Sequence, residues 1–228
     1  PGHPEDAESI QQSVETLDRH IQQADAVFLL TDTRESRWLP TVAAAAHNKV
    51  LINAALGLDS WLVMRHGGSP DTSNRHGCYF CNDVVAPENS TRNRTLDQQC
   101  TVTRPGLALI ASSMAGEIMV SLLHHPDRLS APAPLPSTKF STTTADAGPL
   151  GVIPHQIRGS LVSYTMMTPS VPAFQYCTAC SAGLVDAYRN DKVNLVQNVC
   201  STPDGSYLED LSGMTAYRAE EAEKLVDM

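Results

Sequence analysis

Two Cys-x-x-Cys pairs, far apart in the sequence, restrict the fold of this chain more than any other feature. The pairs are Cys78–Cys81 and Cys177–Cys180. Two thiolates in a tight turn can chelate one ion, and a second pair completes the closed tetrahedral shell of structural zinc. Such a site would join the C-terminal part of the chain to a distant loop, so we expect a structural metal within a larger fold. Unconnected buried cysteines and a redox pair stay open as alternatives, although redox motifs usually have a single pair.

A further cysteine, Cys100, lies between the two pairs and has no role in that metal shell. Arg92, Arg94 and Arg104 lie near it in the sequence and could stabilise its thiolate. A stabilised thiolate is a nucleophile, so Cys100 is a candidate catalytic residue. The alternative is a small buried apolar side chain, the commonest environment of a free cysteine. Cys200 has a less suggestive environment, and we interpret it as structural.

Length and charge narrow the class of protein. The 228 residues suffice for one large domain or two small ones, and a hydrophobic fraction of 42% provides a core. The formal net charge of −9 argues against a surface that binds nucleic acid. No apolar run approaches the roughly 18 residues that suggest a membrane span. Because the sequence begins at Pro1 without a starting Met, we expect a fragment or a processed product.

The pattern of apolar residues in the first third of the chain predicts an α/β layered fold. Helical spacing alternates there with short continuous apolar runs, which are typical of buried parallel strands. The predicted helices span 6–23 and 35–47, and the predicted strands span 26–30, 49–54 and 57–64. This order of elements indicates helices packed on a parallel sheet.

The later part of the chain contains polar segments and further helices. Residues 66–106 are polar, and a loop of that length is usually functional or disordered. We then predict a helix over 107–124, a flexible Pro/Ser/Thr-rich loop over 127–150, a strand within 157–167, and a helix over 179–189 that begins inside the second cysteine pair. We divide the chain into a main unit, 1–205, and an acidic C-terminal tail, 206–228.

A polar turn that contains Asp32 follows the first predicted strand. In α/β sheets ligands bind beyond the carboxyl ends of the strands, and a carboxylate there could hold Mg²⁺ and orient phosphates. An arginine one helical turn further on could reach a phosphate or fix that carboxylate. The alternative is that Asp32 caps the helix that follows.

Several long strings of the sequence resemble a known family. They are LLTDTRESRWLPT, GCYFCNDVVAPENSTRNRTLDQQCTVTRPGLA, MAGEIMVSLLHHP, GVIPHQIRG, FQYCTACS and YLEDLSG. Through these strings the chain resembles the autophagy-related seven family, the ubiquitin-like-modifier activating enzymes of autophagy, along its whole length. The resemblance implies a Rossmann-like adenylation domain that activates the C-terminal glycine of a modifier with Mg-ATP. An acyl-adenylate and pyrophosphate form first, and the modifier then moves to an enzyme cysteine as a thioester.

The resemblance also implies partners and a location. Modifiers of the autophagy-related eight and twelve types would be the substrates. Conjugating enzymes of the autophagy-related three and ten types would accept the modifier from the thioester. Members of the family form homodimers through this domain and act in the cytoplasm and at the pre-autophagosomal structure.

The resemblance carries over to individual cysteines. Cys100 matches the cysteine that forms the thioester. The structural zinc ligands of the family match Cys78, Cys81, Cys177 and Cys180. In this interpretation the metal site is a staple, and the nucleophile lies in the loop that the staple helps to anchor.

The match at the nucleotide motif is incomplete. Asp32 and Arg37 match the first and last positions of the family's Asp-Asn-x-x-(Ser/Thr)-Arg motif near Mg-ATP, but Thr33 stands where the motif has Asn. The family's Gly-rich nucleotide loop has no counterpart in the printed sequence, so we expect that these residues alone do not adenylate a modifier. The alternative hypothesis is a non-catalytic, zinc-stabilised module that binds the modifier.

Overall fold

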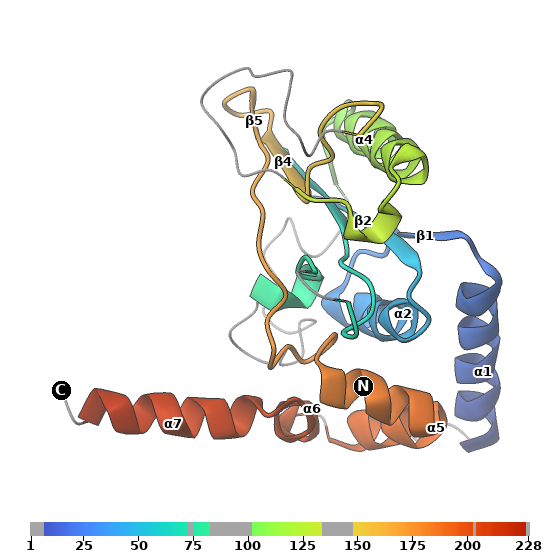
Figure 1. Cartoon of the computed structure of the whole chain (residues 1–228), viewed down its shortest axis with the longest axis vertical. Helices are drawn as coiled ribbons and strands as arrows, with labels where there is room; N and C mark the ends of the chain where they lie inside the picture. Colours follow the sequence, from blue (N-terminus) through green and yellow to red (C-terminus); the bar gives the residue numbers. More distant parts are fainter. Residues whose placement is uncertain (1–6, 73–74, 83–101, 134–147, 203, 227–228) are drawn as a thin grey trace.

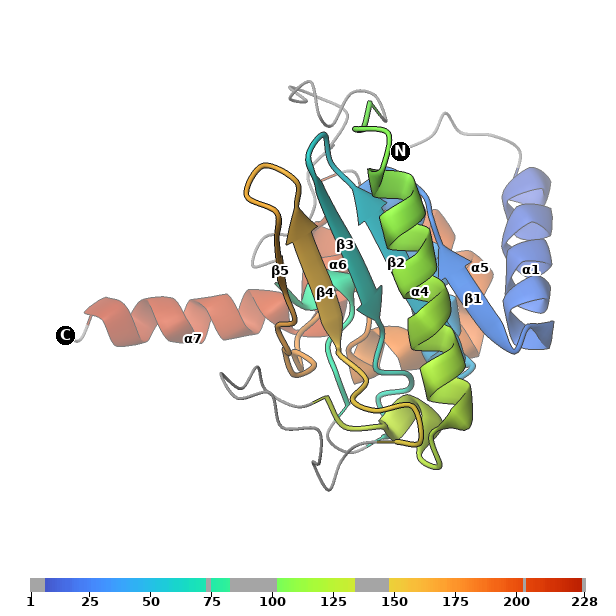
Figure 2. The ribbon, with the colours of Figure 1, turned by 90° about the horizontal axis from the view of Figure 1, so that it is seen from above.

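The chain folds into a five-stranded sheet with helices on both faces (Figures 1 and 2). The computed structural model describes residues 7–72, 75–82, 102–133, 148–202 and 204–226. The strands are β1 (Ala26–Leu29), β2 (Val50–Leu56), β3 (Ser60–Arg65), β4 (Gln156–Ser160) and β5 (Thr165–Met167), in this order across the sheet. The helices are α1 (Ala7–Gln23), α2 (Arg34–Ala46), α4 (Leu107–His124), α5 (Ala182–Ser201), α6 (Ser206–Ser212) and α7 (Met214–Val226), with short 3-10 helices η1 (Tyr79–Asn82) and η2 (Arg128–Ser130).

The sheet is mixed, which corrects the prediction of a parallel sheet. Strands β1 and β2 are parallel, as expected for strands joined through a helix, but the pairs β2–β3, β3–β4 and β4–β5 are all antiparallel. The reason is the short connection after β2, where the Gly57 amide donates to the Ser60 carbonyl across a tight turn. A parallel partner would need a crossover of a dozen or more residues. The third strand therefore begins at Ser60 rather than at residue 57.

Helix α4 covers one face of the sheet, where it packs on β2 and β3 (Figure 2). Its inner residues Leu107, Ala111, Ile118 and Leu122 are buried in an apolar cluster with strand residues that include Trp61. The predicted bounds 107–124 are confirmed. By length and composition alone α4 is the one helix in the described ranges that could cross a membrane, and the core helix of a soluble protein passes the same test.

The other face of the sheet carries two layers of helices. Helix α2 lies against β1 and β2, and α5 packs in turn on α2 and α1 (Figure 1). Helix α5 begins at Ala182, after the second cysteine pair rather than inside it, because residues 177–180 form a turn of their own. Helices α6 and α7, which the sequence analysis did not predict, follow α5, and α7 extends away from the body of the molecule.

One close approach within the sheet depends on glycine. The ring of Trp61 in β3 lies over Gly159, its partner in β4. A Cβ atom at residue 159 would lie 2.0 Å from Cζ2 of Trp61, a distance that no side chain tolerates. The tryptophan can therefore lie flat across the sheet under α4 only because its neighbour has no side chain.

Candidate metal centre and nucleotide edge

The first cysteine turn, Cys78–Cys81, is a tight turn closed by its own backbone. The Cys81 amide donates to the Cys78 carbonyl at 3.0 Å, and the Cys78 amide donates to Cys81 Sγ at 3.2 Å. The 3-10 helix η1 begins within this turn, at Tyr79. Folded this way, both sulfur atoms face the same side, as chelation of one ion requires.

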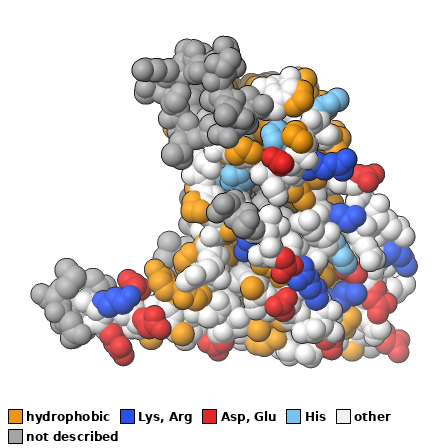
Figure 3. All heavy atoms as spheres, in the orientation of Figure 1, with side chains coloured by type: hydrophobic (Ala, Val, Ile, Leu, Met, Phe, Trp, Pro, Cys, Tyr) orange, Lys and Arg blue, Asp and Glu red, His pale blue; other side chains and the backbone are white. Residues whose placement is uncertain are grey.

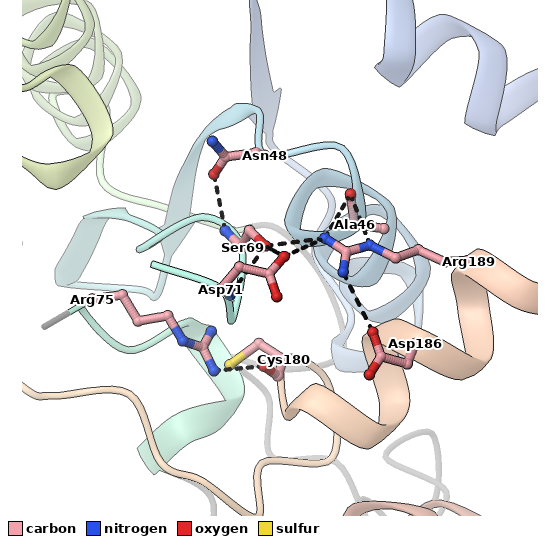
Figure 4. Close-up of polar contacts among 8 residues, drawn as sticks. All are labelled: Ala46, Asn48, Ser69, Asp71, Arg75, Cys180, Asp186 and Arg189. Atoms are coloured by element: carbon pink, nitrogen blue, oxygen red, sulfur yellow. Dashed lines mark hydrogen bonds and ion pairs between the residues drawn. The ribbon is translucent and has the colours of Figure 1, made fainter. Parts of the chain in front are cut away.

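The second cysteine turn, Cys177–Cys180, is held from outside by two side chains. Trp38 of α2 donates through Nε1 to the Thr178 carbonyl at 2.8 Å. Arg75 donates through Nη2 to the Cys180 carbonyl at 2.7 Å, as Figure 4 shows. The Ser181 amide donates to the Cys177 carbonyl and closes the turn. Because these backbone oxygens are bound, the turn has a fixed orientation before any ion binds.

The two turns meet because the chain segments that precede them pair with each other. The Gly77 amide donates to the Val171 carbonyl at 2.9 Å, and the Ala173 amide donates to the Arg75 carbonyl at 3.1 Å. His155 joins both segments, since its Nε2 donates to the Gly77 carbonyl and its Nδ1 accepts from the Val171 amide. Burial lowers the pKa of His155 to about 4, which keeps the ring neutral and able to do both.

The four sulfur atoms have the spacing of a tetrahedral metal shell. Cys78 Sγ lies 3.6 Å from Cys177 Sγ and 3.8 Å from Cys81 Sγ, and Cys81 Sγ lies 3.5 Å from Cys180 Sγ. All four lie within 4.8 Å of one another. Zn–S bonds of about 2.3 Å place the sulfurs of a regular tetrahedron about 3.8 Å apart, so the donor set fits zinc. The structure thus brings together all four predicted ligands from distant parts of the chain.

The electrostatics of this cluster also favour a cation. Hydrogen bonds from the thiols of Cys177, Cys180 and Cys78 lower the pKa of Cys81, and the Phe174 amide adds a hydrogen bond to its sulfur at 3.4 Å. Burial raises the pKa of Cys78 well above its usual value. One thiolate therefore forms readily, while further ionisation in the same buried space needs a positive ion to offset the repulsion.

Asp32 and Arg37, the residues predicted to lie near Mg-ATP, follow the carboxyl end of β1, a region that we call the nucleotide edge. Its geometry shows which residue caps α2. Thr33 is the N-cap of α2, because its side chain accepts a hydrogen bond from the Ser36 amide at 3.2 Å. The interpretation of Asp32 as the cap is therefore wrong. Asp32 lies one residue earlier and is exposed, and its carboxylate makes no hydrogen bond or ion pair with another described residue.

The prediction for Arg37 is that it reaches a phosphate or fixes the Asp32 carboxylate; in the structure its side chain contacts a backbone carbonyl and an aromatic ring. Arg37 is only 6% exposed, and its Nε donates to the carbonyl of Thr31 at 2.9 Å. The guanidinium carbon lies 4.8 Å from the centre of the Tyr79 ring, in the first cysteine turn. Arg37 therefore fixes the backbone next to Asp32 through its hydrogen bond to Thr31. It also contacts the first cysteine turn through the ring of Tyr79.

The predicted nucleophile, Cys100, lies outside the described residues, as do Arg92 and Arg94. Arg104 is described, and it donates through Nη1 to the Leu161 carbonyl at 3.1 Å and lies 3.5 Å from the Asp59 carboxylate. It thus joins the start of α4 to the two hairpin turns of the sheet. Cys200 is exposed at the end of α5 and lies apart from the four clustered cysteines.

Arg189 of α5 holds the loop segment that precedes the first cysteine turn (Figure 4). It donates to the Ala46 carbonyl at the end of α2, to Ser69 Oγ at 3.0 Å, and to Asp71 Oδ2 at 2.9 Å. The sequence analysis missed this residue, as it missed Trp38, Arg75 and His155, because the partners of each are distant in the sequence. Arg189 and His155 contact the loop that leads into the first cysteine turn, and Arg75 belongs to that loop.

Helices α6 and α7 form a C-terminal arm, and its two ends carry different kinds of side chain. In the view of Figure 3, charged side chains lie along α7, and apolar side chains gather where the arm leaves the body. At that base the rings of Tyr176 and Tyr217 stack with centroids 4.9 Å apart, and Phe174 packs edge-on against both. Since the Phe174 amide also bonds Cys81 Sγ, the arm begins directly beside the metal centre.

Comparison with known proteins gives a consistent result. The family model described as the ThiF family matches residues 4–148. The "Ubiquitin-like modifier-activating enzyme ATG7" of Homo sapiens is 44% identical over 262 residues, which cover 100% of this chain and 37% of that protein. The protein of the same name from Emericella nidulans is 49% identical over 219 residues, covering 93% of this chain and 32% of that protein.

Two further comparisons complete these findings. The ATG7 protein of Ajellomyces capsulatus is 46% identical over 219 residues, with 94% of this chain and 30% of that protein covered. The chain therefore spans about a third of the length of the curated relatives it matches. The solved structure titled "Crystal structure of E. coli MccB" has a TM-score of 0.46 and 13% identity, with 79% of this chain and 43% of that chain covered.

Proposed function

This chain belongs to the ThiF family, and we propose that it is the cysteine-bearing part of an activating enzyme for the ubiquitin-like modifiers of autophagy. The observation that carries the proposal is the identity of 43–49% to proteins named as such enzymes, over nearly the whole chain. The reaction would start from the C-terminal carboxylate of a modifier, which is a poor electrophile. Attack of that carboxylate on the α-phosphate of ATP forms an acyl-adenylate and releases pyrophosphate.

Cys100 is the proposed nucleophile of the second step. Its thiolate attacks the acyl carbon of the adenylate, the C–S bond forms, and AMP leaves with the electrons of the broken C–O bond. The thioester keeps the acyl group reactive toward the next thiol, that of a conjugating enzyme. The proposed substrates are modifiers of types eight and twelve, and the proposed acceptors are conjugating enzymes of types three and ten.

Asp32 and Arg37 are the proposed residues of the Mg-ATP site in this chain. The exposed carboxylate of Asp32 lies just beyond the carboxyl end of β1, the edge at which α/β sheets bind ligands, and it is free of capping duty. Carboxylate oxygen is the ligand type that Mg²⁺ prefers. Arg37 holds the adjoining backbone, so the support for its role is positional.

Cys78, Cys81, Cys177 and Cys180 are the proposed ligands of a structural zinc ion. When bound, zinc would supply a fixed crosslink and no chemistry of its own, because four thiolates leave no open coordination position. The residues around the four cysteines fix the orientation of the two cysteine turns. Trp38 orients one turn and His155 aligns the segments that lead into both.

We also propose that the protein is a homodimer and that α4 takes part in the contact. Leu109, Val120 and Leu123 on its outer side are exposed, and Leu109 is 72% exposed. An apolar helix face of this kind is typical of a surface that another protein surface covers. Sedimentation of the intact protein with Leu109→Glu and Leu123→Glu would then show a lower mass than the unchanged protein shows, and equal masses would contradict the dimer contact.

The test of the proposed function uses the intact protein with modifier and Mg-ATP. We expect a modifier adduct that a thiol reductant cleaves, and in Cys100→Ser an adduct that resists the reductant, because an ester replaces the thioester. Cys200→Ser is the matched control and should behave as the unchanged protein does. A reducible adduct that persists in Cys100→Ser would remove Cys100 from its role. Capture of modifier without ATP, and without any adduct, would instead support the non-catalytic binding module.

A further inference from the structure

We infer that Tyr79, which lies between two of the metal ligands, is a positioning residue for the nucleotide edge. Its ring supports the guanidinium of Arg37, and Arg37 in turn holds the backbone beside Asp32. The inference rests on the proposed function, because it assigns a role in Mg-ATP binding at that edge. It goes beyond that function by connecting the metal centre to the adenylation step through one identified contact.

The first link is the contact between the tyrosine ring and the arginine. The guanidinium carbon of Arg37 lies 4.8 Å from the ring centroid, within the distance at which the negative face of an aromatic ring attracts a cation. Arg37 is 6% exposed, so little water competes for its charge. A buried cation needs such a partner, because desolvation without compensation is costly.

The second link is the hydrogen bond from Arg37 to the turn after β1. Nε donates to the Thr31 carbonyl at 2.9 Å, so the guanidinium is held by an acceptor at one edge and lies over the ring of Tyr79. Asp32 follows directly in the chain. The position of its carboxylate therefore depends on a backbone segment that α2 holds from one side through Thr33 and from below through Arg37.

The third link is the attachment of Tyr79 itself. The residue stands between Cys78 and Cys81, in the turn that the Cys81 amide closes on the Cys78 carbonyl and that the Cys78 amide ties to Cys81 Sγ. Its backbone amide donates to Nε2 of the buried His66, and its ring packs edge-on against Phe80, which is 1% exposed. The ring is therefore placed by the fold of the cysteine turn, so whatever holds that turn also holds the support of Arg37.

A surface tyrosine elsewhere in the chain offers a matched comparison. Tyr164, in the turn between β4 and β5, is 79% exposed, and its ring contacts no other aromatic ring or cation of the described residues. Substitution there changes the same side chain without touching the metal centre or the nucleotide edge. It controls for the loss of a tyrosine as such.

The decisive experiment varies only the electron density of the ring. In the intact protein, residue 79 is replaced by phenylalanine and by phenylalanines with one, two and three ring fluorines, which keep the shape but weaken the attraction for a cation. ATP–pyrophosphate exchange with modifier gives KM for Mg-ATP and kcat. We expect Tyr79→Phe to lie within about two-fold of the unchanged protein, and KM to rise stepwise with fluorination by about three- to thirty-fold in total, the range of a partly desolvated cation–π contact.

Two additional measurements separate the possible failures. The zinc content of each variant shows whether the metal site is intact, and the solvent exchange of the Arg37 Nε proton, followed by NMR, reports the bond to Thr31 without any activity. Exchange should quicken along the fluorine series and stay unchanged in Tyr164→Leu. A flat series in both KM and Nε exchange, with zinc retained, overturns the inference. Absence of pyrophosphate exchange in the unchanged protein would contradict the proposed function, while the Nε exchange would still decide the role of Tyr79.

Discussion

The two faces of the sheet are held by different kinds of contact. On the α4 face, the buried cluster consists of aliphatic residues and Trp61, and the helix presents alanine, leucine and isoleucine to the strands. On the opposite face, the buried cluster includes the cysteine turns, and two of its aromatic members, Trp38 and Tyr188, each donate a hydrogen bond. The contacts inside the α4 cluster are mainly apolar, whereas those on the opposite face also depend on particular hydrogen-bond partners.

The difference shows which face can direct chemistry. Apolar packing is non-directional, so it fixes the distance between layers but not the direction of single groups. Hydrogen bonds and metal ligands have defined directions, and on the second face they continue from the cysteine turns through Tyr79 and Arg37 to the edge with Asp32. The described site residues, which are Asp32, Arg37 and the four clustered cysteines, therefore lie where such contacts can orient them.

We call the sheet face that carries α2, α5 and the cysteine turns the directional face. The largest expected effect comes from removing a metal ligand there. Cys81→Ser should abolish tight zinc binding and lower the free energy of unfolding by a sizeable part of the roughly 10 kcal/mol that structural zinc supplies in small domains. Metal analysis and urea unfolding measure both effects. Cys200→Ser, at an exposed cysteine, is the control and should retain zinc and stability. If Cys81→Ser keeps one zinc per chain and normal stability, the cysteine cluster is not a structural metal site.

The next largest effect should come from the apolar face. Leu122 in α4 is 1% exposed, and Leu122→Ala should lower the free energy of unfolding by about 2–5 kcal/mol, through lost burial and the cavity that remains. Leu58, in the turn between β2 and β3 and outside the proposed dimer contact, is 47% exposed, so Leu58→Ala should cost well under half as much. Zinc content should stay normal in both variants. Loss of zinc in Leu122→Ala would show that the two faces are not independent.

The sequence predicted these two faces unequally. The helix in 107–124 was predicted with its exact bounds, since a long apolar segment between two prolines gives a strong signal, and the four metal ligands followed from their spacing. The antiparallel β2–β3 pair was missed although the short connection at residues 57–60 is a local signal for it. The antiparallel β3–β4 pair did not follow, because nothing local shows that β3 pairs with a strand from the far end of the chain. His155, Trp38 and Tyr79 were missed for the same reason: their partners are distant in sequence.

A smaller effect, dependent on pH, is expected at the contact that fastens α1 to the directional face. Asp18 is buried and accepts hydrogen bonds from Tyr188 at 2.8 Å and from His47 at 2.6 Å, and Lys192 pairs with it at 2.9 Å. Burial alone would raise the pKa of Asp18, but the bonds from His47, Lys192 and Tyr188 outweigh it and lower the pKa below the usual 3.8. Asp18→Asn should cost about 1–3 kcal/mol near neutral pH, because donors are left without a charged acceptor.

The sign of the pH dependence follows from the lowered pKa. A carboxyl group whose pKa is lower in the folded state stabilises the fold fully above the unfolded value of 3.8, and this contribution declines below that pH and is lost as the pH falls through the folded pKa. Urea unfolding of both proteins from pH 7 to pH 3 should therefore show a difference in the free energy of unfolding that is constant down to about pH 4 and becomes smaller below it. The exposed Asp25→Asn serves as control. A gap that widens in acid would contradict the lowered pKa.

The smallest effect tests whether the nucleotide edge needs its helix cap as well as its support from below. Thr33→Ala removes the acceptor of the Ser36 amide and should cost about 1 kcal/mol, whereas Thr33→Ser keeps the oxygen and should cost less. Because Arg37 holds the Thr31 carbonyl independently, we expect the loss of the cap to leave the Arg37 Nε proton protected from exchange. If Thr33→Ala exposes that proton as strongly as ring fluorination at residue 79, the cap, rather than the cysteine turn, positions the edge.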